Sequence, residues 1–275
     1  MSSNSASRRY GGIDAVKLAA AFLVVAIHTG PLLTYGEYSE FLLTGILARL
    51  AVPFFFMASG YLFFRKLTGR PRKDKRALRK YGCKIAGLYA VAIIVYLPLN
   101  VYKGDFGEGT TLGSVIRDIV IDGMFYHLWY LPALWVGIHL VCFLHKWLPA
   151  KGMFAVTLGL YVVGLLGDSY YGLAIRSDVL RQTYDWLFLW FDYTRNGLFF
   201  APVFLALGLR AAQHPERDGH RLALPGLFLM SLAGLYLEGM ALQAADLPRH
   251  DSMYVMLLPA VYVLFLLALR VKVRA

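Results

Sequence analysis

Apolar runs of about 20 residues recur along this chain, and they constrain its fold more than any other feature. The chain has 275 residues, 58% hydrophobic and 16% charged, with a mean hydropathy of +0.54. A soluble domain usually carries about 25% charged residues. Because backbone groups inside a bilayer must be hydrogen bonded within the chain, such runs indicate spanning helices. We therefore expect a single all-α domain over residues 1–275, a polytopic transmembrane helical bundle.

About eight runs are long enough to span the lipid bilayer. Basic residues are concentrated between Arg65 and Lys84, which marks a cytoplasmic loop, and alternation then puts both termini in the cytoplasm. The net charge of +11 is therefore interpreted as a topology signal of a multi-pass protein of the bacterial inner membrane, not as a nucleic-acid-binding surface. The expected spans are 12–34, 41–64, 83–102, 126–146, 152–167, 187–210, 222–243 and 252–270.

The first apolar run contains two ionisable residues, Lys17 and His28, with ten residues between them. Eleven helical steps return to within about 20° of the same face, roughly 16 Å further along the axis. Asp14 falls on that face as well. This stripe thus places Asp14 and Lys17 near the cytoplasmic surface and His28 in the outer half of the membrane. Because ionisable groups in a bilayer are costly, an intramembrane His is a functional-site hypothesis.

Other polar residues are expected at the depth of His28, roughly 8–14 Å beneath the external surface. They are Arg49 in the second span, Arg195 in the sixth and Glu238 in the seventh, with His127 opening the fourth. Several polar groups at one depth are typical of a polar cavity.

Each of these residues also has a structural interpretation. His28 can be a buried neutral side chain, and the arginines can snorkel towards the membrane surface. Glu238 can be a structural carboxyl or the partner of an ion pair. Asp14 and Lys17 can form a local i, i+3 pair.

Other features give no chemistry of their own. Residues 112–125 and 184–192 mix apolar, aromatic and acidic residues, as interfacial segments do. Cys83 and Cys142 are both expected near inner helix ends, so a structural disulfide is not expected. The chain contains no metal-ligand spacing, phosphate-binding loop or Ser/His/Asp motif, so neither a metal nor a permanently bound cofactor is expected.

Two opening motifs resemble those of acyltransferase family 3, membrane proteins that move acyl groups to extracytoplasmic acceptors. The segment IDAVKLAAAFLVVAIH contains the family's pattern of a basic residue followed, after ten intervening positions, by a His; here these are Lys17 and His28. The segment RLAVPFFFMASGYLF begins with Arg49 and contains Ser59. Later stretches, FYHLWYLPAL and DYTRNGLFFAPVFLALG, resemble the branch that includes the membrane half of vancomycin-resistance serine racemases.

The resemblance implies transfer of an acyl group, acetyl in the leading hypothesis, from cytosolic acyl-CoA to a hydroxyl acceptor near the outer face. His28 would be the general base, with Arg49 and Arg195 stabilising the oxyanion or orienting the acceptor. Lys17 and Asp14 would lie at the CoA entrance, while Ser59, Tyr193 and Glu238 would contribute to binding. The alternative is a membrane carrier for a small amino acid such as serine, with an arginine on the carboxylate and Glu238 on the ammonium. Acceptor identity and oligomeric state stay open.

Overall fold

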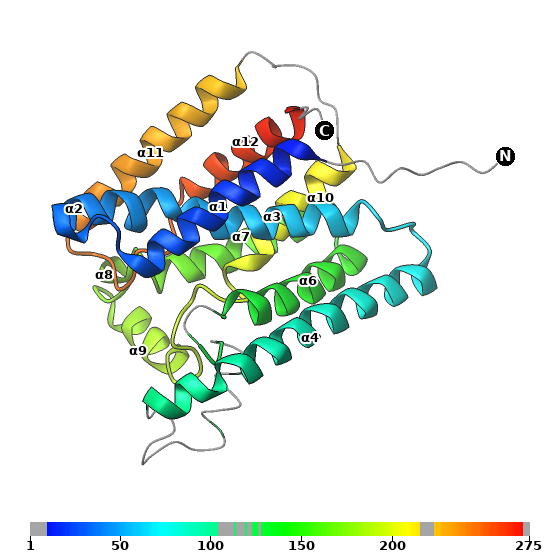
Figure 1. The fold of residues 1–275 in the computed structure, drawn as a ribbon, viewed down its shortest axis with the longest axis horizontal. Helices are drawn as coiled ribbons and strands as arrows, with labels where there is room; N and C mark the ends of the chain where they lie inside the picture. The colour runs from blue at the N-terminus through cyan, green and yellow to red at the C-terminus, as the bar shows by residue number, and fades with distance from the viewer. Residues whose placement is uncertain are drawn as a thin grey trace.

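The computed structural model describes residues 10–103, 113, 119, 123–125, 128–214 and 223–271. Over these residues all regular elements are helical and no strand is present, which confirms the all-α prediction. Figure 1 shows the helices gathered in one bundle. The long helices are α1 (Gly11–Thr29), α3 (Ala51–Phe64), α4 (Pro71–Lys103), α6 (Tyr130–Trp147), α7 (Ala150–Leu166), α10 (Ala201–Gln213), α11 (Leu224–Ala244) and α12 (Leu257–Arg270). The short elements are η1 (Leu33–Tyr35), α2 (Glu37–Glu40), η2 (Phe41–Ile46), η3 (Leu47–Leu50), α8 (Tyr171–Ala174) and α9 (Asp178–Leu187).

Each of the predicted apolar runs overlaps one of the long helices. Four helical stretches are long and apolar enough to cross a membrane by length and composition: Gly11–Thr29, Glu37–Phe64, Pro71–Tyr102 and Leu224–Ala244. Helices α7, α10 and α12 are apolar but shorter. The chain thus has the helices of a membrane protein, while the number of spans and the side of the membrane that each terminus faces stay predictions.

Helices α3 and α10 form the centre of the bundle, and most of their side chains are buried. Two glycines allow their backbones to touch. A Cβ added at Gly60 would lie 2.7 Å from the Leu205 carbonyl oxygen, and one at Gly208 would lie 2.7 Å from the Tyr61 amide nitrogen. Small residues at such crossings let membrane helices pack closely. The close contact matters for function because α3 follows Arg49 and α10 follows Arg195 in the chain.

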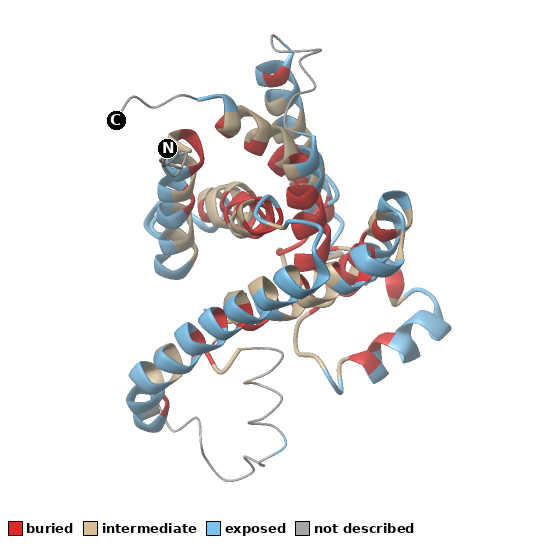
Figure 2. Ribbon diagram, turned by 90° about the vertical axis from the view of Figure 1, so that its right-hand side faces the viewer, coloured by how far each residue is buried: buried red, intermediate tan, exposed pale blue. Residues whose placement is uncertain are grey.

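Helices α1, α4 and α11 lie at the outside of the bundle and expose large apolar side chains. Figure 2 shows the exposed residues of the long helix α4 in pale blue. Phe22 on α1, Ile94 on α4 and Met230 on α11 are 68%, 68% and 70% exposed. A water-soluble protein rarely exposes such extended apolar surface, whereas lipid tails match it. These faces are the expected lipid contacts.

The start of α1 and the end of α12 lie together at one end of the bundle. Gly12 packs against the Ala268 backbone so closely that any side chain at this position would clash. The guanidinium of Arg65, just after α3, lies 4.6 Å from the centre of the Tyr10 ring. The basic segment from Arg65 to Lys84 therefore begins at the same end of the bundle as Asp14 and Lys17.

The second predicted span is one helical stretch, Glu37–Phe64, with an irregular middle. Within it, η2 is a π-helix of six residues and η3 a 3-10 turn of four residues that contains Arg49. Short π segments inside helices occur frequently at functional sites. This irregularity determines the direction in which Arg49 leaves the helix.

The predicted sixth span, 187–210, is not one helix, and this prediction is wrong. Helix α9 ends at Leu187, α10 begins at Ala201, and Arg195 lies in the turn between them. Asn196 fixes this turn: its side-chain oxygen accepts hydrogen bonds from the backbone N–H groups of Leu198 and Phe199, at 2.9 and 3.0 Å. Asparagine often makes such local bonds in place of helical ones.

Two of the sequence predictions concern residues outside the described ones: His127, and most of the segment 112–125. The other expected interfacial segment, 184–192, covers the end of α9 and the residues after it. Trp186 and Trp190 are exposed there, whereas Tyr184 and Leu187 are buried. This segment therefore has one apolar face packed on the protein and two indole rings directed away from it.

Candidate functional site

A pocket of about 320 Å³ lies where α1, the η3–α3 segment, the start of α6 and the turn before α10 meet. The pocket contains an imidazole and two guanidinium groups, and apolar and aromatic side chains form the rest of its wall. The structure thus brings His28, Arg49 and Arg195 together, although their roles stay predictions. The lining residues are Val24, Ile27, His28, Arg49, Val52, Phe55, Trp129, Tyr130 and Arg195.

His28 lies in the last turn of α1 and is exposed within the described part of the chain. The helix ends one residue later because Gly30 adopts a left-handed conformation, φ +57°, and donates its N–H to the Ala26 carbonyl. Glycine adopts this conformation without steric cost. His28 therefore lines the pocket from the last turn of α1, together with Val24 and Ile27 of the same helix.

Arg49 reaches the pocket from the 3-10 turn η3. The π-helix before it is tied to another element, because the Tyr254 hydroxyl donates a hydrogen bond of 2.8 Å to the Gly45 carbonyl oxygen. Tyr254 is itself fully buried and lies just before α12. The unusual backbone that directs Arg49 is therefore supported from outside its own helix.

Arg195 is only 6% exposed, although it carries a charge. Its guanidinium lies 4.4 Å from the centre of the Tyr193 ring and 5.4 Å from that of Trp129. Its Nη1 atom donates a hydrogen bond of 3.4 Å to the Ser252 hydroxyl. Aromatic faces attract a desolvated cation, so the two rings and the hydroxyl hold the charge at the pocket wall.

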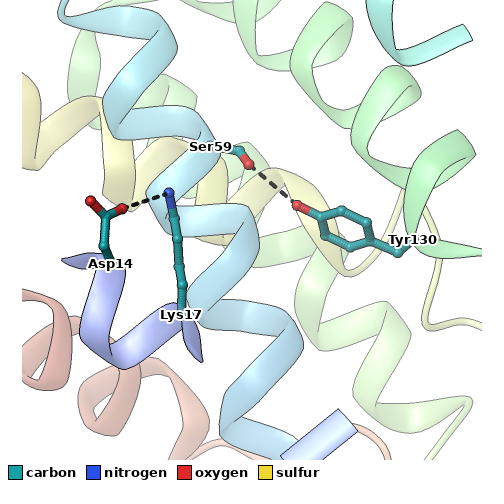
Figure 3. A network of polar contacts seen from close by, with 4 residues as sticks. All are labelled: Asp14, Lys17, Ser59 and Tyr130. Carbon is teal, nitrogen blue, oxygen red and sulfur yellow. Dashed lines mark hydrogen bonds and ion pairs between the residues drawn. The ribbon is translucent and has the colours of Figure 1, made fainter. Parts of the chain in front are cut away.

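Tyr130 connects the pocket with Ser59. The two hydroxyl groups are 3.2 Å apart on α3 and α6, and either can donate (Figure 3). The Tyr130 ring packs on Phe56 with centroids 4.7 Å apart. Ser59 does not line the pocket, and it contacts it through the Tyr130 hydroxyl. Tyr193 likewise adjoins the pocket through Arg195.

Asp14 and Lys17 are not in this pocket, as expected from their position near the start of α1. The Lys17 ammonium lies 3.9 Å from the Asp14 carboxylate, and the pair is partly exposed (Figure 3). This is the i, i+3 pair that the sequence permits. Their suggested role at an entrance for CoA stays a prediction.

Glu238 is not brought to the pocket either. Its carboxylate accepts hydrogen bonds from the Val255 and Met256 N–H groups, at 2.6 and 2.8 Å, and from the Tyr170 hydroxyl at 2.6 Å. Val255 and Met256 directly precede α12, where N–H groups lack partners within the helix. The contacts favour the structural interpretation of Glu238.

The charge of the pocket is positive. No carboxylate is among the described residues that line it, whereas two guanidinium groups are. Such a pocket favours an anionic ligand or an oxygen that becomes negative during a reaction. In the described part of the chain, no group of three or more His, Cys, Asp or Glu side chains is placed to hold a metal ion.

Trp129, Tyr130 and Ser252 were not predicted as site residues. Trp129 and Tyr130 follow His127, and aromatic residues at that position are typical of a membrane interface. Ser252 lies in the connection between α11 and α12, in a segment without a recognised motif. Their contribution depends on contacts between distant parts of the chain, so the sequence contained no specific signal for it.

Comparison with known proteins agrees with the resemblance. A profile of an acyltransferase domain family matches residues 10–274. The chain is 41% identical over 265 residues, 96% of its length, to an amino-acid racemase of Enterococcus faecalis, and 38% identical over 261 residues to a serine/alanine racemase of Enterococcus gallinarum. These alignments cover 36% and 37% of the two relatives, so the chain spans little more than a third of their length. No solved structure matches.

Proposed function

The chain belongs to acyltransferase family 3, whose domain covers residues 10–274, and from this premise we propose that it transfers an acyl group from cytosolic acyl-CoA to a hydroxyl acceptor near the outer membrane face. The acyl group in this proposal is acetyl. The observation that carries the proposal is the pocket of about 320 Å³ that His28, Arg49 and Arg195 line together. Acyl transfer needs a general base and a group that stabilises the oxyanion, and an imidazole and a guanidinium can fill these two roles.

In the proposed reaction, the His28 imidazole accepts the proton of the acceptor hydroxyl as its oxygen attacks the thioester carbonyl carbon. The carbonyl oxygen becomes negative, and Arg49 and Arg195 stabilise it. When the tetrahedral intermediate collapses, the C–S bond breaks, the acyl ester remains and the CoA thiolate takes the proton from His28. Because Arg195 is nearly desolvated, its charge acts more strongly there than it would in water.

The donor would approach along α1. Lys17 lies at the end of the bundle where the basic segment begins, and a phosphate group of CoA is a suitable ligand for such cations. His28 lies eleven positions after Lys17, roughly 16 Å further along a helix. The proposal therefore places the nucleotide of CoA outside the pocket and only the thioester end beside His28.

The test uses purified protein in liposomes with labelled acetyl-CoA and measures free CoA and labelled product. The variant His28→Ala is expected to lose acyl transfer while retaining its fold. The matched control is His139→Ala, since His139 lies on α6 with its ring nitrogen 2.7 Å from the Trp135 carbonyl and outside the pocket. Activity of the His28 variant near that of wild type would refute the assignment.

A carrier for a small amino acid is the second candidate. Two guanidinium groups facing one pocket also suit an α-carboxylate, and the similar proteins are named amino-acid racemases. Against a carrier with Glu238 as the ammonium ligand, that carboxylate is already engaged by three hydrogen-bond donors. Uptake of labelled serine into liposomes without release of CoA would favour the carrier.

A further inference from the structure

The connection between α11 and α12 contacts the residues that support Arg195. The Ser252 hydroxyl accepts the hydrogen bond from Arg195 Nη1 at 3.4 Å. The His250 ring packs on Tyr193, with centroids 4.7 Å apart, and Tyr193 in turn lies beneath the guanidinium. Two residues of one connection thus influence the position of the same charge in the pocket.

Asp168, which comes from a different part of the chain, holds this connection in place. It follows α7 and is completely buried. Its Oδ1 atom accepts hydrogen bonds from the Ser252 N–H at 2.8 Å, the Met253 N–H at 3.0 Å and the Ser169 hydroxyl at 2.9 Å.

The backbone carbonyl of Asp168 holds the connection at a second point, since it accepts the Arg249 N–H at 3.0 Å. Burial of a carboxylate costs free energy unless hydrogen-bond donors contact it, and the Asp168 carboxylate has the three donors to Oδ1.

The bonds form a path from Asp168 to the pocket. Asp168 fixes the backbone of Ser252, the backbone fixes the place from which the Ser252 side chain starts, and the Ser252 hydroxyl bonds to Arg195. Neither Asp168 nor Ser252 lines the pocket. Groups that stabilise a developing charge must be held in place before the reaction, and a displacement of about 1 Å can cost about 100-fold in rate.

We propose that Asp168 is a positioning residue for Arg195 and acts through Ser252. The part of this inference that concerns catalysis rests on the proposed acyl transfer. The geometric part does not, because it states only that the Asp168 side chain restrains the guanidinium of Arg195. The two parts are tested separately.

The geometric test is modification of arginine by phenylglyoxal, followed by mass spectrometry of the peptides, which needs no turnover. In Asp168→Ala, we expect Arg195 to react at least about tenfold faster than in wild type, because the hydrogen bond from its charged guanidinium to the Ser252 hydroxyl is weakened. In Asp168→Asn, which keeps an acceptor oxygen at the same place, the rate should return to within about twofold of wild type. In Ser252→Ala, Arg195 should also react faster than in wild type, although Asp168 still accepts the backbone N–H groups of residues 252 and 253.

The matched control is Tyr161→Phe. The buried Tyr161 hydroxyl donates a hydrogen bond of 2.6 Å to the Tyr254 carbonyl. Its removal therefore deletes one contact to the connection between α11 and α12, but this contact is not part of the path from Asp168 to Arg195. Its Arg195 reaction rate should equal that of wild type. The rate at Arg49, read in the same samples, reports general loosening. Equal acceleration at Arg49 and Arg195, or an unchanged Arg195 rate in Ser252→Ala, would overturn the proposal.

The catalytic test measures release of CoA. We expect Asp168→Ala to lower kcat about 100-fold with little change in KM, because a charge that acts in the transition state is misplaced. In an Arg195→Ala background the same substitution should add less than about threefold, since both changes remove one interaction. Fully additive losses would indicate a purely structural role and refute the inference. If wild-type protein releases no CoA, the proposed function fails while the phenylglyoxal result still decides the positioning.

Discussion

The contact between α3 and α10 allows a sharp test of the fold, because one methyl group should destabilise it. In Gly208→Ala the new Cβ would lie 2.7 Å from the Tyr61 amide nitrogen and closer still to the Met57 carbonyl oxygen. Both neighbours are backbone atoms of α3, so no side-chain rotation relieves the clash. The helices would have to separate by roughly 1 Å to restore normal van der Waals distances.

Overpacking of this kind costs about 1–3 kcal/mol. For a chain of this size, a loss of about 2 kcal/mol corresponds to roughly 4–8 °C in Tm. The matched control is Gly159→Ala on α7, where an added Cβ meets nothing within 4 Å. There the same methyl group should stabilise the helix by up to about 1 kcal/mol, since alanine is the better helix former.

The assay is thermal unfolding in detergent, followed by a dye that becomes fluorescent on reaction with a thiol. Cys142 is partly buried and serves as the reporter after the exposed Cys83 is replaced by serine in all variants. We expect Tm to fall in Gly208→Ala and to stay level or rise in Gly159→Ala. Equal Tm values for the two variants would contradict the close contact described here.

Three further predictions concern residues outside the pocket. Glu238→Ala should lower the free energy of unfolding by about 1–3 kcal/mol, measured by thermal unfolding, because it removes the acceptor of two N–H groups before α12. Asp14→Asn should change it by less than about 0.5 kcal/mol, since the ion pair with Lys17 is long and partly exposed. Burial, together with Arg249, Arg195 and Arg49, lowers the pKa of His250 from 6.5 to about 4, so its stabilising contribution is complete above pH 6.5 and is lost as the pH falls towards 4. Tm should therefore fall less over this range in His250→Gln than in wild type, and parallel curves would contradict it.

Much of the architecture follows from the apolar pattern alone. The helices α1, α4 and α11 lie within or overlap predicted runs, because a stretch that contacts lipid has to be apolar over its whole length. The sequence alone singled out His28 and Arg49 as candidate site residues, because an ionisable residue in an apolar stretch is unusual. Their meeting with Arg195 was expected from depth, and the structure brings the three together in one pocket.

The remaining features depend on contacts that an average over apolar residues does not capture. In the run 187–210, high hydrophobicity hid the turn signal in DYTRNG, where the Asn196 side chain replaces helical bonds. Depth alone also suggested Glu238 as a pocket residue, but a carboxylate at that level can equally hold the start of a neighbouring helix. Which of the two it does depends on the direction in which α11 faces, and this direction is set by packing against α12.

The stretch from Phe41 to Leu50 is a π-helix followed by a 3-10 turn, and this backbone limits how many residues the stretch can contain. The residues before and after it face in directions fixed by the number of amino acids between them, and one residue more or less turns one part against the other by about 100°. Glu40, which accepts the Leu32 N–H at 2.8 Å, and Arg49, which lines the pocket, therefore cannot both keep their contacts after an insertion or deletion here. Engineered variants of this protein should keep the number of residues in this stretch unchanged, even where side chains are replaced freely.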